Sequence, residues 1–351
     1  MKWNVKTLGR MAEDGEGTLW LAAPGSEISF QVTGGRRLEM NLKWDGAVPE
    51  STPERIWPRY AIYLDGTKIM DARLNLAERR MTVFEDPTAG EHTIRLVKLS
   101  ECSHSLIGIS DIQTDGTMRP MPEKKLKIEF IGDSITCGYG VEGTEKDTFS
   151  TETENAEKSH AFLAGQALEA DTAMTAYSGC GLISGWTDGE RNDGNLMIPI
   201  YEKAGRMNWT LPGGKRLQDM EWDFSAWQPD YIVIDLGNND QSWTREMPER
   251  KALYQEKYRE FLSMVRRNNP GARILCALGV EGPALVAEMK EAAAQWQAET
   301  GDTALRTLEL AKMDPEQDGA GADMHPSERT QKKLGRQVEQ ALREWMETDR
   351  A

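Results

Sequence analysis

Residues 127–134 read Lys-Ile-Glu-Phe-Ile-Gly-Asp-Ser, a short apolar run that stops at a glycine and two polar side chains. Apolar runs of similar length occur at Tyr231 to Leu236 and Ala272 to Leu278, with weaker ones at 172–177 and 303–309. Helical patterns lie between and after them, at 159–170, 249–267, 284–299 and 327–347. Buried strands that alternate with helices predict a parallel α/β sheet with helices on its faces.

The first third of the chain has a different periodicity. Apolar and polar residues alternate at Ile28 to Val32, Leu38 to Leu42, Ala61 to Leu64 and Thr93 to Val97. This alternation is typical of half-buried strands. We expect turns between them at Pro24-Gly25, Gly34-Gly35, Asp65-Gly66 and Ala89-Gly90. The pattern predicts an antiparallel β-sandwich or jelly roll over residues 1–118, followed after a proline-containing connector by a second domain over 119–351.

Composition narrows the classes of partner. The 351 residues carry 42 Lys and Arg against 57 Asp and Glu, and the net charge of −15 disfavours nucleic acid or an anionic membrane as a partner. No apolar run approaches the length of a membrane span. The four cysteines form no CxxC pair, so we interpret them as free thiols. The start, MKWNVKTLGR, lacks an apolar signal core, so we expect a cytoplasmic protein, or a secreted one if a leader is missing. The oligomeric state is left open.

Polar residues with catalytic potential follow the predicted strands. Ligands of open α/β sheets bind beyond the carboxyl ends of the strands, and Ser134, Gly181 and Asn239 occupy such positions. A serine needs a base to become a nucleophile, and of four histidines only His325 precedes an α/β helix with a carboxylate two positions away. Residues i and i+2 of an extended segment share a face, so Asp323 is expected to orient the imidazole. The pattern predicts a Ser134–His325–Asp323 triad.

Acyl transfer also needs N–H donors for the developing oxyanion. The backbone N–H groups of Ser134 and Gly181 and the side-chain amide of Asn239 are the candidates. Trp186, Trp209 and Trp243 are candidate sugar-facing platforms. Core packing explains any single one of them equally well. This chemistry requires no metal or organic cofactor, and none is predicted.

Several other stretches have a structural and a functional interpretation. Gly138 to Gly143 fits GxGxxG, yet it begins several residues after the strand and leads into a polar loop, which argues against dinucleotide binding. Asp133 is interpreted as a structural hydrogen-bonding residue. Residues 188–194 lack the spacing of a calcium loop and are interpreted as a solvated turn. Cys137 and Cys180 are interpreted as buried thiols and not as nucleophiles.

The short segments around Ser134, Gly181, Asn239 and His325 resemble the four sequence blocks of the SGNH (GDS-type) hydrolase superfamily, in which Ser, Gly, Asn and His occur in succession. More specifically, Gly132 to Gly143, Tyr177 to Leu182 and Trp222 to Asp230 look like carbohydrate esterase family two. Parts of the front half are similar to it as well, at Ala23 to Ser26, Tyr63 to Gly66 and Gly90 to Ile94. The resemblance implies an N-terminal jelly roll, a flavodoxin-like SGNH-hydrolase domain, and removal of acetyl groups from sugars and plant polysaccharides.

The sequence departs from the family pattern in three places. Asn238 stands where a small residue or threonine is expected, Cys180 where lysine is common, and residues 203–221 are longer than usual. Some family members lack the acid beside the histidine and use a backbone carbonyl, whereas Asp323 here favours the full triad.

We therefore expect a serine esterase that releases acetate from O-acetylated sugars or xylan- and glucomannan-type oligosaccharides through an acetyl-enzyme. The alternatives are an SGNH esterase, thioesterase or lipase-like hydrolase of other acyl esters, and a glycan-binding protein without turnover.

Overall fold

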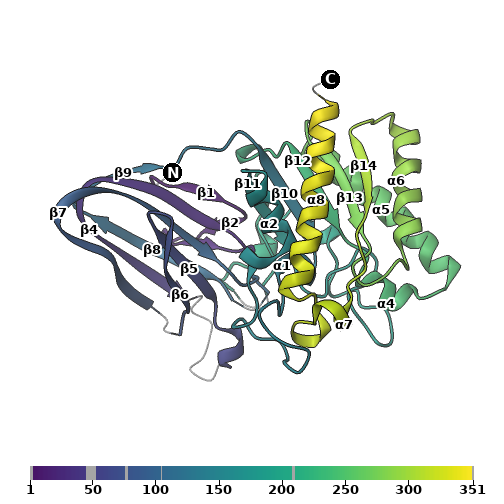
Figure 1. Ribbon diagram of the computed structural model, residues 1–351, viewed down its shortest axis with the longest axis horizontal. Coiled ribbons are helices and arrows are strands. Elements are labelled where there is room, and N and C mark those ends of the chain that lie inside the picture. Colours follow the sequence, from purple (N-terminus) through teal and green to yellow (C-terminus); the bar gives the residue numbers. More distant parts are fainter. Residues whose placement is uncertain (1–2, 45–52, 76–77, 104, 208–209, 350–351) are drawn as a thin grey trace.

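The computed structural model describes residues 3–44, 53–75, 78–103, 105–207 and 210–349, which form two sheets (Figure 1). The first sheet is antiparallel and has the strand order β2-β3-β8-β4-β7-β5-β6, with β1 and β9 also paired to β4. Its strands are β1 (Lys6–Leu8), β2 (Met11–Glu13), β3 (Leu19–Leu21), β4 (Glu27–Trp44), β5 (Arg59–Leu64), β6 (Thr67–Arg73), β7 (Glu78–Lys98), β8 (Ile107–Thr114) and β9 (Thr117–Pro120). The predicted antiparallel front part is confirmed.

Two of the four expected turns are bulges instead. Pro24-Gly25 and Asp65-Gly66 are turns between strands, but Gly34-Gly35 lies inside β4 and Ala89-Gly90 inside β7. The pairing of β4 with β7 shifts register at Gly34-Gly35, where Gly34 has a φ of 73°. A glycine with positive φ can absorb the extra residue of a bulge, so each strand continues and bends where the sequence pattern indicates a chain reversal.

The second sheet is parallel, in the order β11-β10-β12-β13-β14. Its strands are β10 (Lys127–Gly132), β11 (Asp171–Ala176), β12 (Tyr231–Asp235), β13 (Arg273–Leu278) and β14 (Leu305–Glu309). One face packs on α2 (His160–Ala167) and α8 (Glu328–Thr348), and the other on α5 (Pro248–Asn268) and α6 (Val286–Thr300). The remaining short helices are α1 (Ser134–Cys137), α3 (Ile198–Tyr201), α4 (Asp240–Thr244) and α7 (Pro315–Asp318). The predicted α/β architecture is confirmed.

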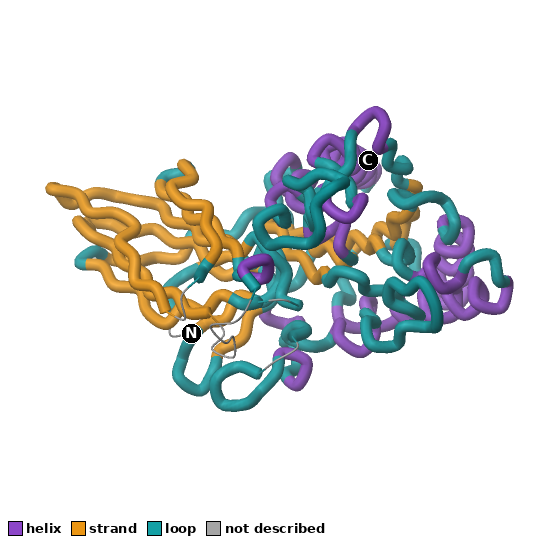
Figure 2. The backbone as a smooth tube through the Cα atoms, turned by 90° about the horizontal axis from the view of Figure 1, so that it is seen from below, coloured by secondary structure: helices purple, strands orange, loops and turns teal. Residues whose placement is uncertain are grey.

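The two parts are in contact (Figure 2), and β1 lies beside the edge strand β11. There the Lys6 ammonium lies 2.7 Å from a carboxylate oxygen of Asp171. Residue 118, after which we predict the domain boundary, lies inside strand β9. The boundary stays a prediction. No helix of the described residues has the length and apolarity needed to cross a membrane.

Candidate active site

Ser134 lies where β10 ends and α1 begins. Asp133 is the N-cap of this short helix, and its carboxylate accepts a hydrogen bond from the Ile135 N–H at 3.0 Å. The same carboxylate accepts hydrogen bonds from the side-chain amides of Asn238 (3.2 Å) and Asn239 (3.0 Å). Asp133 therefore has the structural role predicted for it, because it fixes the turn that presents the serine.

His325 lies in the loop before α8, 191 positions after Ser134 in the sequence, and contacts it directly. Its Nε2 lies 2.9 Å from Ser134 Oγ. The ring of Tyr139 stacks on the imidazole with centroids 4.0 Å apart. The two loops approach closely because Gly140 has no side chain: a Cβ there would lie 2.8 Å from the Ala322 nitrogen. The GxGxxG stretch thus packs the serine loop against the histidine loop.

The protonation of His325 follows from its neighbours. Its Nδ1 lies 3.2 Å from the carbonyl oxygen of Ala322, and a carbonyl can only accept. Nδ1 therefore carries the proton and Nε2 is the acceptor that faces the serine hydroxyl. Burial lowers the pKa of His325 below its usual 6.5, although the Ala322 carbonyl acts in the opposite direction. The imidazole is held in the neutral form that a general base requires.

Asp323 does not lie where the sequence pattern places it. Its carboxylate accepts hydrogen bonds from the Tyr139 hydroxyl at 2.6 Å and the Phe149 N–H at 2.9 Å. The same-face argument needs an extended backbone, but Asp323 (φ 50°) and Met324 (φ 61°) are both left-handed. The carboxylate is therefore turned away from Nδ1, and the Ala322 carbonyl takes its place. In this geometry Asp323 contacts the tyrosine that stacks on the base.

The three candidate oxyanion donors are brought to one place, but two of them already donate to other acceptors. The Gly181 N–H donates to the Asn195 carbonyl at 3.1 Å. The Asn239 amide donates to Asp133 and, at 2.9 Å, to the Cys180 carbonyl. Within the described part of the chain, the Ser134 N–H has no hydrogen-bond acceptor. Ser134 is thus the donor that is ready for an oxyanion, and the roles of Gly181 and Asn239 stay predictions.

Asp240 is an important residue that the sequence argument did not single out. It is fully buried, and its carboxylate accepts hydrogen bonds from the backbone N–H groups of Leu182, Ile183 and Ser184 at 2.7–3.1 Å. Burial raises the pKa of Asp240 to about 6. The available signal was its place directly after Asn239, which puts it at the same sheet edge as the 181–184 turn.

The unusual Asn238 also has a place in the site. Its side-chain amide donates to both Asp133 and Asp235, each at 3.2 Å. Both carboxyls are buried, and burial together with their mutual repulsion raises the pKa of Asp133 well above its usual range. Asn238 therefore bridges the two carboxyl groups. A small side chain at this position would have no amide to donate to them.

The candidate tryptophans differ in their surroundings. Trp186 is 61% exposed, in the loop that follows the 181–184 turn. Trp243 is half-buried against the core, and the Arg250 guanidinium lies 4.3 Å from the centre of its ring. Trp209 lies outside the described residues. Their contact with substrate stays a prediction.

The thiols near the site are buried. Burial raises the pKa of Cys137 and of Cys180 well above the usual value, which keeps both protonated. Among the described residues, Cys137 also forms a group with Glu101 and Glu154 whose potential ligand atoms lie within 4.8 Å of one another. Burial raises the pKa of Glu154 too, and protonated thiols and carboxyls bind metal ions poorly.

Comparison with known proteins places this geometry in context. Residues 130–333 match the GDSL-like Lipase/Acylhydrolase family and residues 7–123 match the Carbohydrate esterase 2 N-terminal family. An acetylxylan esterase / glucomannan deacetylase of Cellvibrio japonicus is 25% identical over 98% of this chain and 89% of its own length. The cellulase/esterase CelE of Acetivibrio thermocellus is 31% identical over 75% of this chain, which spans only 31% of that longer protein.

Solved structures agree with these matches. A family two carbohydrate esterase from Clostridium thermocellum in complex with cellohexaose has a TM-score of 0.82 and 26% identity, over 97% of this chain and 99% of that one. The acetyl xylan esterase Est2A from Butyrivibrio proteoclasticus has the same fold, with a TM-score of 0.82 and 23% identity over 98% of this chain and 95% of its own.

Proposed function

Since the chain belongs to the GDSL-like lipase/acylhydrolase family and carries the N-terminal region of carbohydrate esterase family two, we propose that it is an acetyl esterase of O-acetylated polysaccharides. The observation that carries the proposal is the 2.9 Å contact between Ser134 Oγ and His325 Nε2, with the proton of the imidazole held on Nδ1. This arrangement is the one that converts a serine hydroxyl into a nucleophile.

The reaction follows from the positions of these groups. His325 Nε2 accepts the hydroxyl proton while Ser134 Oγ attacks the acetyl carbonyl carbon, and the Ser134 N–H lies at the start of α1 to donate to the oxyanion. When the ester C–O bond breaks, His325 returns the proton to the sugar oxygen and an acetyl-enzyme remains. His325 then takes a proton from water, and the resulting hydroxide attacks the acetyl carbon. When the bond to Ser134 Oγ breaks, His325 returns the proton to Oγ and acetate is released. The Ala322 carbonyl stabilises the imidazolium in both steps.

The relatives guide the choice of substrate. One is named an acetylxylan esterase / glucomannan deacetylase, and a similar structure holds cellohexaose. We infer that this chain removes acetyl groups from β-linked backbones of the xylan and glucomannan type. Acetate release from acetylated xylan, glucomannan and monosaccharide acetates, followed by proton NMR, identifies the preferred backbone and the acetylated position.

The direct test replaces the nucleophile. We expect Ser134→Ala to lower kcat for an aryl acetate by at least about a thousandfold without a change in stability. Ser110→Ala, in the front sheet, is the matched control and is expected to keep full activity. Equal activity of Ser134→Ala and wild type would refute the mechanism, and faster turnover of octanoyl than acetyl esters would favour a lipase-like hydrolase.

A further inference from the structure

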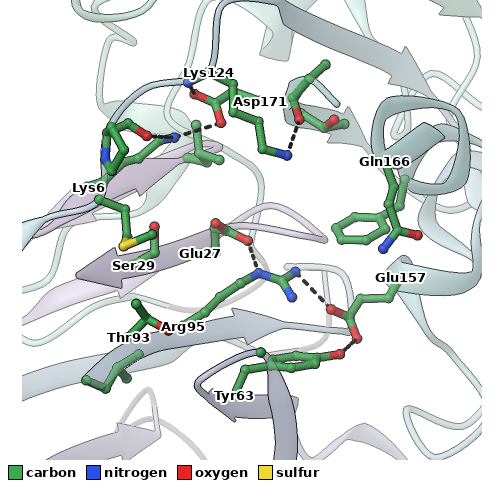
Figure 3. Close-up of a pocket in the computed structure, with 18 residues that line it drawn as sticks. Lys6, Glu27, Ser29, Tyr63, Thr93, Arg95, Lys124, Glu157, Gln166 and Asp171 are labelled. Carbon is green, nitrogen blue, oxygen red and sulfur yellow. Dashed lines mark hydrogen bonds and ion pairs between the residues drawn. The ribbon is translucent and has the colours of Figure 1, made fainter. Parts of the chain in front are cut away.

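The front sheet meets the α/β part at more than one place. One of them is a cavity of about 730 Å³ between the front sheet and α2 (Figure 3). There Arg95 is paired with both Glu27 and Glu157, so the charged groups of the two parts balance one another. The catalytic pair is not among the described residues that line this cavity. The contact therefore joins the two parts without reaching the site of the reaction.

The segment between β7 and β8 makes a different contact, at the catalytic edge of the parallel sheet. Cys102 of this segment is buried in the same apolar core as Tyr177 and Cys180, which follow β11. The ammonium of Lys98 is buried as well, and it donates to the backbone carbonyl of Glu101 at 2.9 Å. These contacts fix the segment of the front part against the loop that follows β11.

The side chain of Glu101 holds the turn at 178–181. Glu101 has no exposed surface, and its Oε2 accepts hydrogen bonds from the Ser178 backbone N–H at 3.0 Å and from the Ser103 hydroxyl at 2.8 Å. On the other side of the turn, the Ser178 carbonyl accepts a hydrogen bond from the Asn195 side chain at 2.8 Å. Both backbone polar groups of Ser178 are therefore held, one of them by the front part.

This turn continues a line of hydrogen bonds to the nucleophile. The Cys180 carbonyl accepts a hydrogen bond from the Asn239 side-chain amide at 2.9 Å, and the same amide donates to Asp133 at 3.0 Å. Asp133 caps the short helix that begins at Ser134. A hydrogen-bonded path therefore leads from Glu101 of the front part to the backbone that presents the nucleophile.

The burial of Glu101 is costly for folding. A carboxylate loses its hydration in the interior, whereas an apolar side chain of similar size would fill the same place without this cost. Burial, together with the charge of Glu101, also raises the pKa of Glu154 well above its usual range. Costly features of this kind are expected where the hydrogen bonds they make serve a functional site.

We propose that Glu101 is a positioning residue of the active site. It holds the 178–181 turn, and through this turn Asn239 and the nucleophile, in the geometry that catalysis requires. The inference rests on the proposed esterase function, and it makes the front part a component of the active site. Because Glu101 acts as the acceptor of an N–H donor, an uncharged acceptor of the same length can replace it.

The test compares three replacements in the full chain. Glu101→Gln keeps an acceptor at the same distance, Glu101→Asp keeps the charge but withdraws the acceptor, and Glu101→Leu removes the acceptor. We expect kcat for an aryl acetate to stay within about threefold of wild type in Glu101→Gln. In Glu101→Leu we expect it to fall by about 10- to 100-fold, since a misplacement of about 1 Å has effects of this size, with Glu101→Asp between the two. KM is expected to change by less than about twofold, because the turn acts on the transition state.

Glu27 provides the matched control. It is 9% exposed, belongs to the same front sheet and also faces the α/β part, at the cavity of Figure 3. Glu27→Leu removes a buried carboxylate from that contact, so we expect lower stability with an unchanged kcat. The rate is expressed per folded molecule, and near-UV circular dichroism measures the folded fraction of each variant.

A second measurement reports on the hydrogen bond itself. The Ser178 amide proton is followed by NMR of the chain labelled with 15N-serine, and its resonance is assigned by its loss in Ser178→Ala. An amide bonded to a carboxylate has a downfield proton resonance, and we expect an upfield shift in Glu101→Gln and in Glu101→Asp. If Glu101→Leu does not fold, these two variants and their order of kcat carry the test.

The rate at which a fluorophosphonate reacts with Ser134 separates this proposal from the proposed function, because that reaction needs no ester substrate. We expect the rate to fall with kcat in Glu101→Leu and to stay near wild type in Glu101→Gln. If wild type hydrolysed no acetyl ester, the proposed function would fail, and this pattern of rates would still support the role of Glu101.

Three outcomes overturn the proposal. The first is a folded Glu101→Leu with the kcat of wild type. The second is a higher kcat in Glu101→Asp than in Glu101→Gln, which would show that the charge matters and not the position of the acceptor. The third is an equal loss of kcat in Glu27→Leu, which would indicate a general loosening of the contact between the two parts.

Discussion

Asp323 and Met324 have left-handed backbone angles directly before His325, and single residues with such angles often occur at functional sites. The conformation turns the Asp323 carboxylate toward Tyr139 and leaves the imidazole on the Ala322 carbonyl. We expect Asp323→Asn to lower kcat/KM for an aryl acetate by less than about tenfold, whereas loss of an orienting triad acid costs on the order of 10⁴. Steady-state kinetics of wild type, Asp323→Asn and His325→Ala measure the loss of kcat/KM in each variant.

The control for this variant is Tyr139→Phe. It removes the hydroxyl bonded to Asp323 and keeps the ring stacked on His325, so a similarly small loss is expected. A ten-thousandfold loss in Asp323→Asn alone would mean that the carboxylate reaches the imidazole during the reaction.

The pH dependence of activity belongs to His325. The neutral imidazole is the active base, and burial lowers its pKa below 6.5, so the base stays active to lower pH than a solvated histidine would. We expect the acid limb of the kcat/KM profile to have its midpoint below pH 6.5. A profile measured with an aryl acetate between about pH 4 and 8 tests this. A midpoint at or above 6.5 would contradict the assignment of a buried, neutral base.

Among the individual residues, the sequence predicted the Ser134–His325 pair but not the hydrogen-bond partners of the residues around it. Ser134 and His325 were identifiable because each lies beside a predicted element at the same sheet edge. The turn of Asp323 was not, because non-glycine residues rarely adopt left-handed angles and a sequence contains no direct signal for them. The partners of Asn239 depend on the distance between two loops, which spacing along the chain does not fix.

Among the elements, the turn at 181–184 depends on Asp240 at the start of α4. Its carboxylate accepts three backbone N–H groups in a fully buried place. We expect Asp240→Ala to lower the free energy of unfolding by about 3 kcal/mol, because it leaves buried donors without an acceptor, and to lower kcat as the turn loosens. Urea denaturation and aryl acetate kinetics measure the two effects.

The exposed Asp188 provides the comparison for that variant. Asp188→Ala is expected to change stability by less than about 0.5 kcal/mol. If Asp240→Ala were as stable and active as wild type, the 181–184 turn would have to be held by other contacts.

Helices and strands were predicted well where a regular apolar pattern extends over many residues. They were predicted poorly where a glycine-containing dipeptide fits either a turn or a bulge. The strands of the parallel sheet were predicted because burial on both faces gives continuous apolar runs, and its helices because their apolar residues recur at helical spacing. The pattern predicts turns at Gly34-Gly35 and Ala89-Gly90, yet the same residues permit a bulge inside a long strand. Only the pairing of β4 with β7 distinguishes the two.

Across the whole molecule, ion pairs join the two parts. Lys6 of β1 and Asp171 of β11 are 9% and 1% exposed. We expect Lys6→Met to lower the free energy of unfolding by about 3 kcal/mol, since it leaves a buried carboxylate without its cation. Lys6→Met combined with Asp171→Leu is expected to recover much of the loss. Chemical denaturation of the single and double variants measures the coupling between the two side chains.

An exposed pair serves as the reference. Lys332 and Glu328 of α8 are 53% and 38% exposed, and Lys332→Met is expected to cost less than about 1 kcal/mol. A loss of the same size for Lys6→Met would mean that this contact between the parts does not depend on burial. Such pairs could not be predicted from the sequence, because they join residues that no local pattern connects.

The hydroxyl and the imidazole that share a hydrogen bond are separated by 191 positions. A ribosome adds residues from the amino end, so every strand of both sheets is made before His325 exists. A nascent chain that already contains its serine therefore still lacks both the base and α8, the helix that covers one face of the parallel sheet. Products of premature termination before codon 325 share this property, which restricts the hydrolytic capacity to chains whose translation has passed that codon.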